Sequence, residues 1–137
     1  MNTTTSVLTA HGYRLDAQEF PELEIPVLSA SQRQGDVLLL KIDDHDMTGA
    51  RPIGARVEVV RSEQGSNTHT LHGKGDWLPN PAASDPDVLV QGWLRVPAGG
   101  EAWLIHTEEH SALGIGAGIY EVRRQREYAG EWRRVAD

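Results

Sequence analysis

The sequence predicts a single all-β domain, either a small sandwich or a barrel-like fold. Three observations support this class. Short runs of aliphatic and β-branched residues recur at intervals of roughly 10–20 residues. Glycine and proline, with 14 and 7 of the 137 residues, are frequent enough to mark turns between these runs. No stretch shows the 3.6-residue apolar period of an amphipathic helix.

Residues 1–33 are predicted to form an extended N-terminal arm, and residues 34–137 to form the β-domain. Pro21 and Pro26 favour extended geometry in the residues before them. We expect the arm to run along the surface or to add an edge strand. The first strand of the domain is predicted at residues 36–42, which are almost continuously apolar and should be covered on both faces. Residues 55–61 and 68–72 are predicted to form the next two strands.

Residues 73–87 contain three prolines and two glycines and are predicted to be a loop, either a working loop or a partner contact. A long strand follows at residues 87–96, with Gly92 marking a bulge. Residues 101–107 are expected to pair with it as a hairpin across the turn at 97–100. A short strand at 112–115, a glycine-rich turn at 116–118 and a final strand at 119–128 complete the prediction.

Composition excludes several classes of function. The chain has no cysteine, so disulfides, thiolate metal sites and cysteine nucleophiles are excluded. The net charge of −7 argues against bulk attraction to nucleic acid or to an anionic membrane. No apolar run approaches the ~20 residues of a membrane helix, and the N-terminus lacks the features of a secretory signal. We therefore expect a cytoplasmic protein that does not associate with membranes.

Histidines form the first candidate site. His69 and His72 lie in one segment, and His106 and His110 lie in another. Imidazoles from two segments can bind Zn, Fe, Ni or Mn, so these four residues are the predicted metal ligands. However, residues three apart on a regular strand face opposite sides, and neither the His-Glu-x-x-His motif nor the cupin pattern is present. The alternative is that these histidines are surface or turn residues that hydrogen-bond to the backbone.

The strand at residues 120–128 carries the second candidate site, because alternation places aromatic and basic side chains on one face. Such a face suits internal cation–π packing, a protein interface or contact with nucleic acid. Acidic neighbours and the net charge disfavour nucleic acid. The predicted interaction surface consists of Tyr120, Arg124, Arg126, Tyr128, Trp132 and Arg133.

Two stretches carry a resemblance to a known group of proteins. Residues 33–39 read RQGDVLL, and the C-terminal part contains HTEEH at 106–110, GIYEVRRQREY at 118–128 and RRVAD at 133–137. These stretches resemble the opening and the ending of a family of small uncharacterised bacterial and phage proteins. Members usually have a Gly-His-x-His segment. This chain has NTHTLH at the corresponding residues 67–72, and this difference weakens the inference of a metal site from the family. The resemblance implies a compact β-fold and, for a phage protein, association with the virion.

The sequence favours a non-enzymatic binding or assembly module. It would act as an accessory or structural subunit that contacts other proteins or forms a homo-oligomer. No pairing of a nucleophile with a base is apparent, and an arm such as residues 1–33 often packs on a neighbour. One alternative is a cupin-like metal-dependent enzyme or metal sensor that uses the histidines. The other is a nucleic-acid accessory protein.

Overall fold

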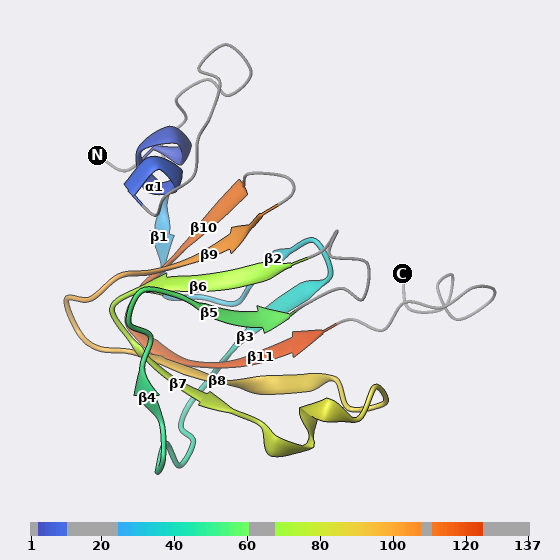
Figure 1. The fold of residues 1–137 in the computed structure, drawn as a ribbon. Helices are drawn as coiled ribbons and strands as arrows, with labels where there is room; N and C mark the ends of the chain where they lie inside the picture. Colours follow the sequence, from blue (N-terminus) through green and yellow to red (C-terminus); the bar gives the residue numbers. More distant parts are fainter. Residues whose placement is uncertain (1–2, 11–24, 61–67, 108–110, 125–137) are drawn as a thin grey trace.

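Two β-sheets stacked face to face form a sandwich in the computed structural model, which describes residues 3–10, 25–60, 68–107 and 111–124 (Figure 1). The predicted all-β sandwich is confirmed, and the sheets do not close into a barrel. The five-stranded sheet has the order β1 (Val27–Leu28), β10 (Ser111–Ile115), β9 (Ala102–His106), β6 (His69–Gly73), β5 (Val57–Val60). The six-stranded sheet has the order β2 (Gln32–Gln34), β3 (Val37–Ile42), β11 (Gly118–Arg124), β8 (Val90–Val96), β7 (Asp76–Pro79), β4 (Arg51–Pro52).

The core lies between the sheets and is built from every second residue of the central strands. Leu71 and Leu104 are cross-strand neighbours in one sheet, and Leu94 and Tyr120 are cross-strand neighbours in the other. All four side chains are fully buried. Burial of one such side chain contributes about 1.5–3 kcal/mol. The buried residues of this cluster are Val37, Leu39, Ile53, Val59, Val60, Leu71, Trp77, Leu94, Val96, Ala102, Leu104, Ile115, Tyr120 and Val122.

The predicted strands at 36–42, 55–61, 68–72, 87–96, 101–107, 112–115 and 119–128 correspond to β3, β5, β6, β8, β9, β10 and β11. Only the described part of the last strand, Gly118–Arg124, is compared. The apolar run of β3 is covered on both faces only in part. Val37 and Leu39 are fully buried, whereas Leu38, Leu40 and Ile42 on the outer face are half-buried.

The predicted hairpin between residues 87–96 and 101–107 is wrong. β8 pairs with β11 and β7, whereas β9 pairs with β10 and β6 in the other sheet. The connection between them, Pro97 to Glu101, crosses from one sheet to the other. Five residues can span the ~10 Å between stacked sheets. Residues 116–117 make the same kind of crossing between β10 and β11.

The predicted loop at residues 73–87 is also more ordered than expected. It contains β7 and a 3₁₀ helix, η1 (Pro81–Ser84). Asn80 caps η1, because its side chain accepts a hydrogen bond from the Ala82 N–H at 3.1 Å. β7 forms because Trp77 supplies a buried side chain opposite Leu94. The burial of Trp77 in the core therefore outweighs the tendency of the nearby prolines to favour a loop.

The N-terminal arm is not extended throughout, because Thr4–Ala10 form the helix α1. Thr3 and Ser6 exchange hydrogen bonds between backbone N–H and side-chain hydroxyl, at 2.8 and 3.0 Å. This reciprocal pattern resembles a capping box. Val7 is buried against Ile25 and Trp103, so α1 packs on the outer face of the five-stranded sheet at its β1 and β10 end (Figure 1). Farther along the arm, β1 adds a parallel edge strand to β10. Asp16 is a candidate N-cap and predicts one helical turn at residues 15–20, which lie outside the described residues.

The two long sides of the sandwich differ. On one side, side chains of the edge strand β2 reach across to the other sheet. Gln32 Nε2 donates to the Gly114 carbonyl at 2.8 Å, and Gln34 Nε2 donates to the Leu104 carbonyl at 2.9 Å. On the opposite side, the edge strands are β4 and β5. The structure therefore has one side closed by glutamine hydrogen bonds and one side where a pocket opens.

Candidate functional site

The buried histidine His69 lies in a hydrogen-bonded network that joins the two sheets. Its Nδ1 is 2.9 Å from Gln34 Oε1, and its Nε2 is 3.1 Å from Asp36 Oδ1. Gln34 is itself oriented, because its Nε2 donates to the Leu104 carbonyl. Its Oε1 must therefore accept from His69 Nδ1. Both ring nitrogens of His69 thus face acceptors carried by the six-stranded sheet.

The turn between β2 and β3 brings these two acceptors to His69. Gly35 lies between them with φ of 57°, a left-handed conformation that glycine adopts without strain. A Cβ at this position would lie 3.5 Å from His69 Cε1, so the turn backbone packs against the ring. The turn formed by the segment from Arg33 to Asp36 therefore favours glycine at position 35.

His69 and His106 are brought together, as the metal hypothesis requires, but their geometry does not suit a shared ion. They are directly opposite on β6 and β9, and their rings stack with centroids 4.4 Å apart and planes 3° apart. A metal ligand bond lies in the imidazole plane at about 2.0–2.1 Å from nitrogen. Parallel stacked rings cannot both aim at one point in this way.

The other two predicted metal ligands do not join this pair. His72 lies on the opposite face of the five-stranded sheet, where its Nε2 is 2.8 Å from the Thr70 hydroxyl. β6 pairs with β9 in regular register, so no bulge moves His72 to the inner face. His110 lies outside the described residues. Within the part of the chain that the structure describes, no group of three His, Asp or Glu side chains could hold a metal ion.

Asp36 is the solvent-facing member of the network, with 28% of its side chain exposed. The hydrogen bond from His69 lowers the pKa of this carboxyl below its usual value, against the opposing effect of burial, and the nearby positive potential of His69 adds to the lowering. A lowered pKa in the folded state stabilises the fold above the unfolded value of 3.8, and that contribution is lost as the pH falls through the folded value.

Asp36→Asn is expected to lower the free energy of unfolding at pH 7 by about 1 kcal/mol, because a charged acceptor is replaced by a neutral one. The difference from the parent protein should shrink as the pH falls below about 4 and the parent carboxyl becomes protonated. Urea unfolding across this pH range measures the effect. Asp43→Asn, at an exposed carboxyl that takes no part in the His69 network, is the control. An Asp36→Asn difference that is constant with pH would contradict this role for the carboxylate.

The predicted arginine–aromatic surface is only partly within the described residues. Tyr120 is fully buried, and its hydroxyl donates to the Gly116 carbonyl at 2.8 Å, so it belongs to the core and not to a surface. Burial raises the pKa of Tyr120. Arg124 is half-buried and donates to the Pro86 carbonyl at 2.8 Å, which holds it against the chain. The remaining four residues, Arg126, Tyr128, Trp132 and Arg133, lie outside the described residues.

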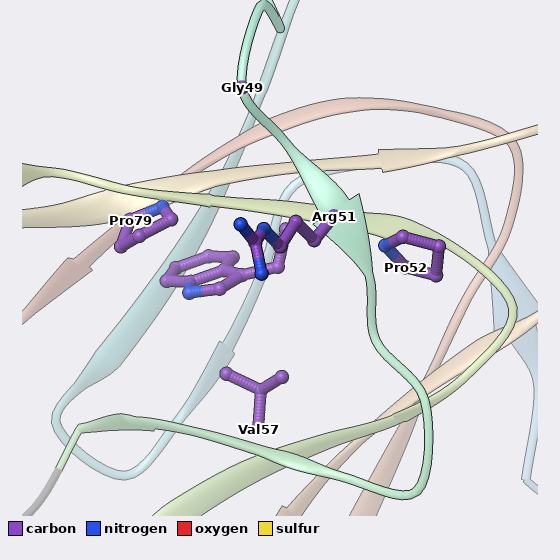
Figure 2. A pocket seen from close by; sticks show the side chains of 6 residues that line it. Gly49, Arg51, Pro52, Val57 and Pro79 are labelled. Carbon is purple, nitrogen blue, oxygen red and sulfur yellow. The ribbon is translucent and has the colours of Figure 1, made fainter.

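A pocket of about 320 Å³ opens on the side of the sandwich where β4 and β5 are the edge strands. Figure 2 shows Arg51 between Pro79 and Pro52, with Val57 facing it across the space. Trp77 is directly opposite Arg51 in the pairing of β4 with β7, so the two side chains share a face of the sheet. The six lining residues are Gly49, Arg51, Pro52, Val57, Trp77 and Pro79.

The position of Trp77 depends on Gly92 in the neighbouring strand β8. A Cβ at Gly92 would lie 2.5 Å from two atoms of the Trp77 ring and 2.5 Å from the Leu78 carbonyl oxygen. Only glycine therefore lets the indole lie over β8. The predicted bulge is found beside it, because the register of β8 with β11 shifts between Gly92 and Val90. The same glycine thus fits the bulge and allows the approach of the indole.

Arg51 is the charged residue of the pocket. Its side chain is exposed and makes no ion pair or hydrogen bond with the described residues. Asp76 is the acidic neighbour on β7, but it pairs with Arg95 at 2.7 Å. Arg51 is therefore a cation with no ion-pair partner among the described residues, and it lies beside an aromatic and aliphatic surface.

Sequence reasoning missed this pocket. The available signal was Trp77, a large aromatic residue within a stretch rich in glycine and proline. A tryptophan in such a stretch indicates that the segment has a surface to pack against. Arg51 gave no local signal, because its relation to Trp77 arises from strand pairing between residues that are 26 positions apart in sequence.

The fold and the site define a small β-sandwich protein with a pocket at one open edge. The pocket is lined by apolar residues and one cationic side chain, Arg51. The chain belongs to the family described as Domain of unknown function (DUF8820), whose model matches residues 33–125. The match covers more than half of the chain, so the resemblance to an uncharacterised family is confirmed at that level. Searches of the curated proteins and of the solved structures found no match. No helix within the described residues has the length and apolar character to cross a membrane.

Proposed function

We propose that this protein is a non-enzymatic binding module that recognises a partner protein through the edge pocket, the pocket lined by Arg51, Val57, Trp77 and their neighbours. The observation that carries the proposal is Arg51, which lies at the mouth of an otherwise apolar pocket and has no ion-pair partner within the described ranges of the chain. Tryptophan and arginine are the residue types most enriched among the dominant contacts of protein interfaces.

The position of the pocket supports a protein ligand. It opens between the edge strands of two sheets, so an extended segment can lie along it and meet backbone groups as well as side chains. Val57, Trp77 and Pro79 belong to paired strands, which hold the lining in place without a ligand. A preformed site of this kind binds at a lower entropic cost than a loop that must order.

The second cluster of polar residues is the network around His69. Its geometry supports a structural role for these residues and not a catalytic one. His69 is fully buried, and each of its ring nitrogens already contacts an acceptor. A general base must reach the proton that it removes. His69 has no path to a substrate in this arrangement, so its contribution is to hold the sheets together.

Val57→Trp is expected to fill the edge pocket and to weaken peptide binding at least about tenfold. The peptides would be selected from a displayed random library against the parent protein. Glu58→Trp is the matched control, because Glu58 is the next residue of the same strand and is exposed on the other face. Affinities from fluorescence anisotropy, with thermal unfolding to confirm that both variants fold, measure the effect. Selection of no peptide, or equal binding by both variants, would refute the proposal.

A further inference from the structure

We infer that the edge pocket recognises an extended protein segment in which a carboxylate side chain stands next to an apolar side chain. This inference rests on the proposed function and adds the chemical class of the ligand. The carboxylate would pair with Arg51, and the apolar side chain would lie against Trp77 and Val57.

The donors of the pocket favour a single negative charge. Arg51 is the one charged residue among the six that line it, and the others are glycine, proline, valine and tryptophan. Pro52 and Pro79 lack a backbone N–H, which leaves the Arg51 guanidinium and the Trp77 indole N–H as the side-chain donors of the lining. A guanidinium fork matches one carboxylate through two parallel hydrogen bonds. A phosphate dianion carries a second negative charge that no other cation of this lining would neutralise.

The apolar walls of the pocket lie close enough to the Arg51 guanidinium for neighbouring residues of one bound segment to contact both. Arg51 and Trp77 are directly opposite in the β4–β7 pair, and such pairs have Cβ atoms about 4.5–5.5 Å apart. An extended chain advances about 3.3 Å per residue. A segment whose carboxylate contacts Arg51 therefore places an adjacent side chain against Trp77 or Val57. An aromatic or large aliphatic residue buries the most apolar surface there.

The charge balance of the molecule adds to this specificity. The protein carries a net charge of −7, so an acidic partner is repelled by most of the surface. Like Arg33 and Arg56, Arg51 has no carboxylate partner among the described residues, but of these three cations it is the one that lines the pocket. Binding of an acidic segment should therefore concentrate at this pocket and weaken as salt screens the guanidinium.

The test uses the full chain and short N-acetylated, C-amidated peptides on an alanine background. Their central pairs are Phe-Glu, Phe-Gln, Phe-Lys and Ala-Glu. N-acetylphenylalanine and inorganic phosphate serve as small anionic probes. Titrations followed by ¹H–¹⁵N spectra give the affinities, with the indole N–H of Trp77 and the Nε–H of Arg51 as reporters. Arg51→Gln removes the proposed charge partner. Arg33→Gln, at the opposite edge of the same sheet, is the matched control.

The Phe-Glu peptide is expected to bind best, and replacing either residue of the pair should weaken binding about tenfold. Arg51→Gln should cause a similar loss and should abolish the preference for Phe-Glu over Phe-Gln, whereas Arg33→Gln should change neither. Equal binding of Phe-Gln or Phe-Lys would overturn the ligand class and leave the proposed function standing. Binding of N-acetylphenylalanine or phosphate as tightly as the peptide would overturn the assignment of a protein segment. If neither this panel nor the displayed library binds, both proposals fail.

Discussion

Replacing His69 with alanine is expected to lower the free energy of unfolding by about 3–4 kcal/mol, the largest loss predicted for a polar residue in this protein. The substitution removes a fully buried ring that hydrogen-bonds Gln34 and Asp36 and stacks on His106. It leaves the Gln34 carbonyl oxygen without its donor and opens a cavity between the sheets. A stranded buried acceptor and a cavity each carry their own cost.

His45→Ala is the control for this substitution. His45 is half-buried and stacks on Trp93 with ring centroids 4.0 Å apart, but it lies in the loop after β3 and outside the core between the sheets. Its loss should cost less than about 1.5 kcal/mol. Urea unfolding at neutral pH compares the two variants. Equal destabilisation by the two changes would show that the His69 network does not hold the sheets together.

Gly92→Ala is the second substitution with a large expected effect, about 2–3 kcal/mol of lost stability. The added methyl group would lie 2.5 Å from the Trp77 ring and from the Leu78 carbonyl oxygen, so either the ring or the strand must move. Because Trp77 lines the edge pocket, the same change should also reduce peptide binding. This links the stability of the sheet to the shape of the site.

Gly99→Ala provides the comparison for Gly92→Ala. A Cβ at Gly99 meets no atom within 4 Å, but the backbone φ of 77° favours glycine. The expected loss is therefore about 1 kcal/mol, from backbone strain alone. Chemical unfolding gives both values, and the indole resonance of Trp77 reports the displacement. A Gly92→Ala protein with unchanged stability and an unshifted Trp77 resonance would contradict the packing described for this pocket.

The positions of the central strands could be predicted from sequence because burial leaves a local pattern. Residues 37–42 and 102–106 are almost continuously apolar, and turn-forming residues mark their ends. The short strands β2, β4 and β7 were missed, and β1 was foreseen only as the edge-strand alternative for the arm. Two to four residues are too few for a period to appear, and their pairing is decided by a neighbour distant in sequence.

The division of strands between two sheets could not be predicted locally. Strands β8 and β9 are separated by a short glycine-containing connection that looks like a hairpin turn. The choice between a hairpin and a crossing depends on which partner buries more surface. Here β11 covers β8 over most of its length, which leaves β9 to pair with β6 and β10.

The edge pocket was missed, whereas the arrangement of the histidines was predicted in part. Alternation along the strand placed His69 and His72 on opposite faces, which the regular register of β6 confirms. The same rule did not reveal that His106 lies opposite His69, because cross-strand pairing is a property of the fold. The contacts of Gln34 and Asp36 with His69 likewise could not be predicted from the sequence, because they depend on how the two sheets pack.

The central claim, that the edge pocket is the recognition site, is tested most directly by mapping a bound peptide on the protein. A peptide selected from the displayed library is titrated into ¹⁵N-labelled protein, and the shifts of assigned resonances are followed. The largest changes are expected at Arg51, Val57 and Trp77, which line the pocket from both sheets. Changes concentrated instead on the outer face of β3 and β11, with the pocket resonances unmoved, would contradict the claim.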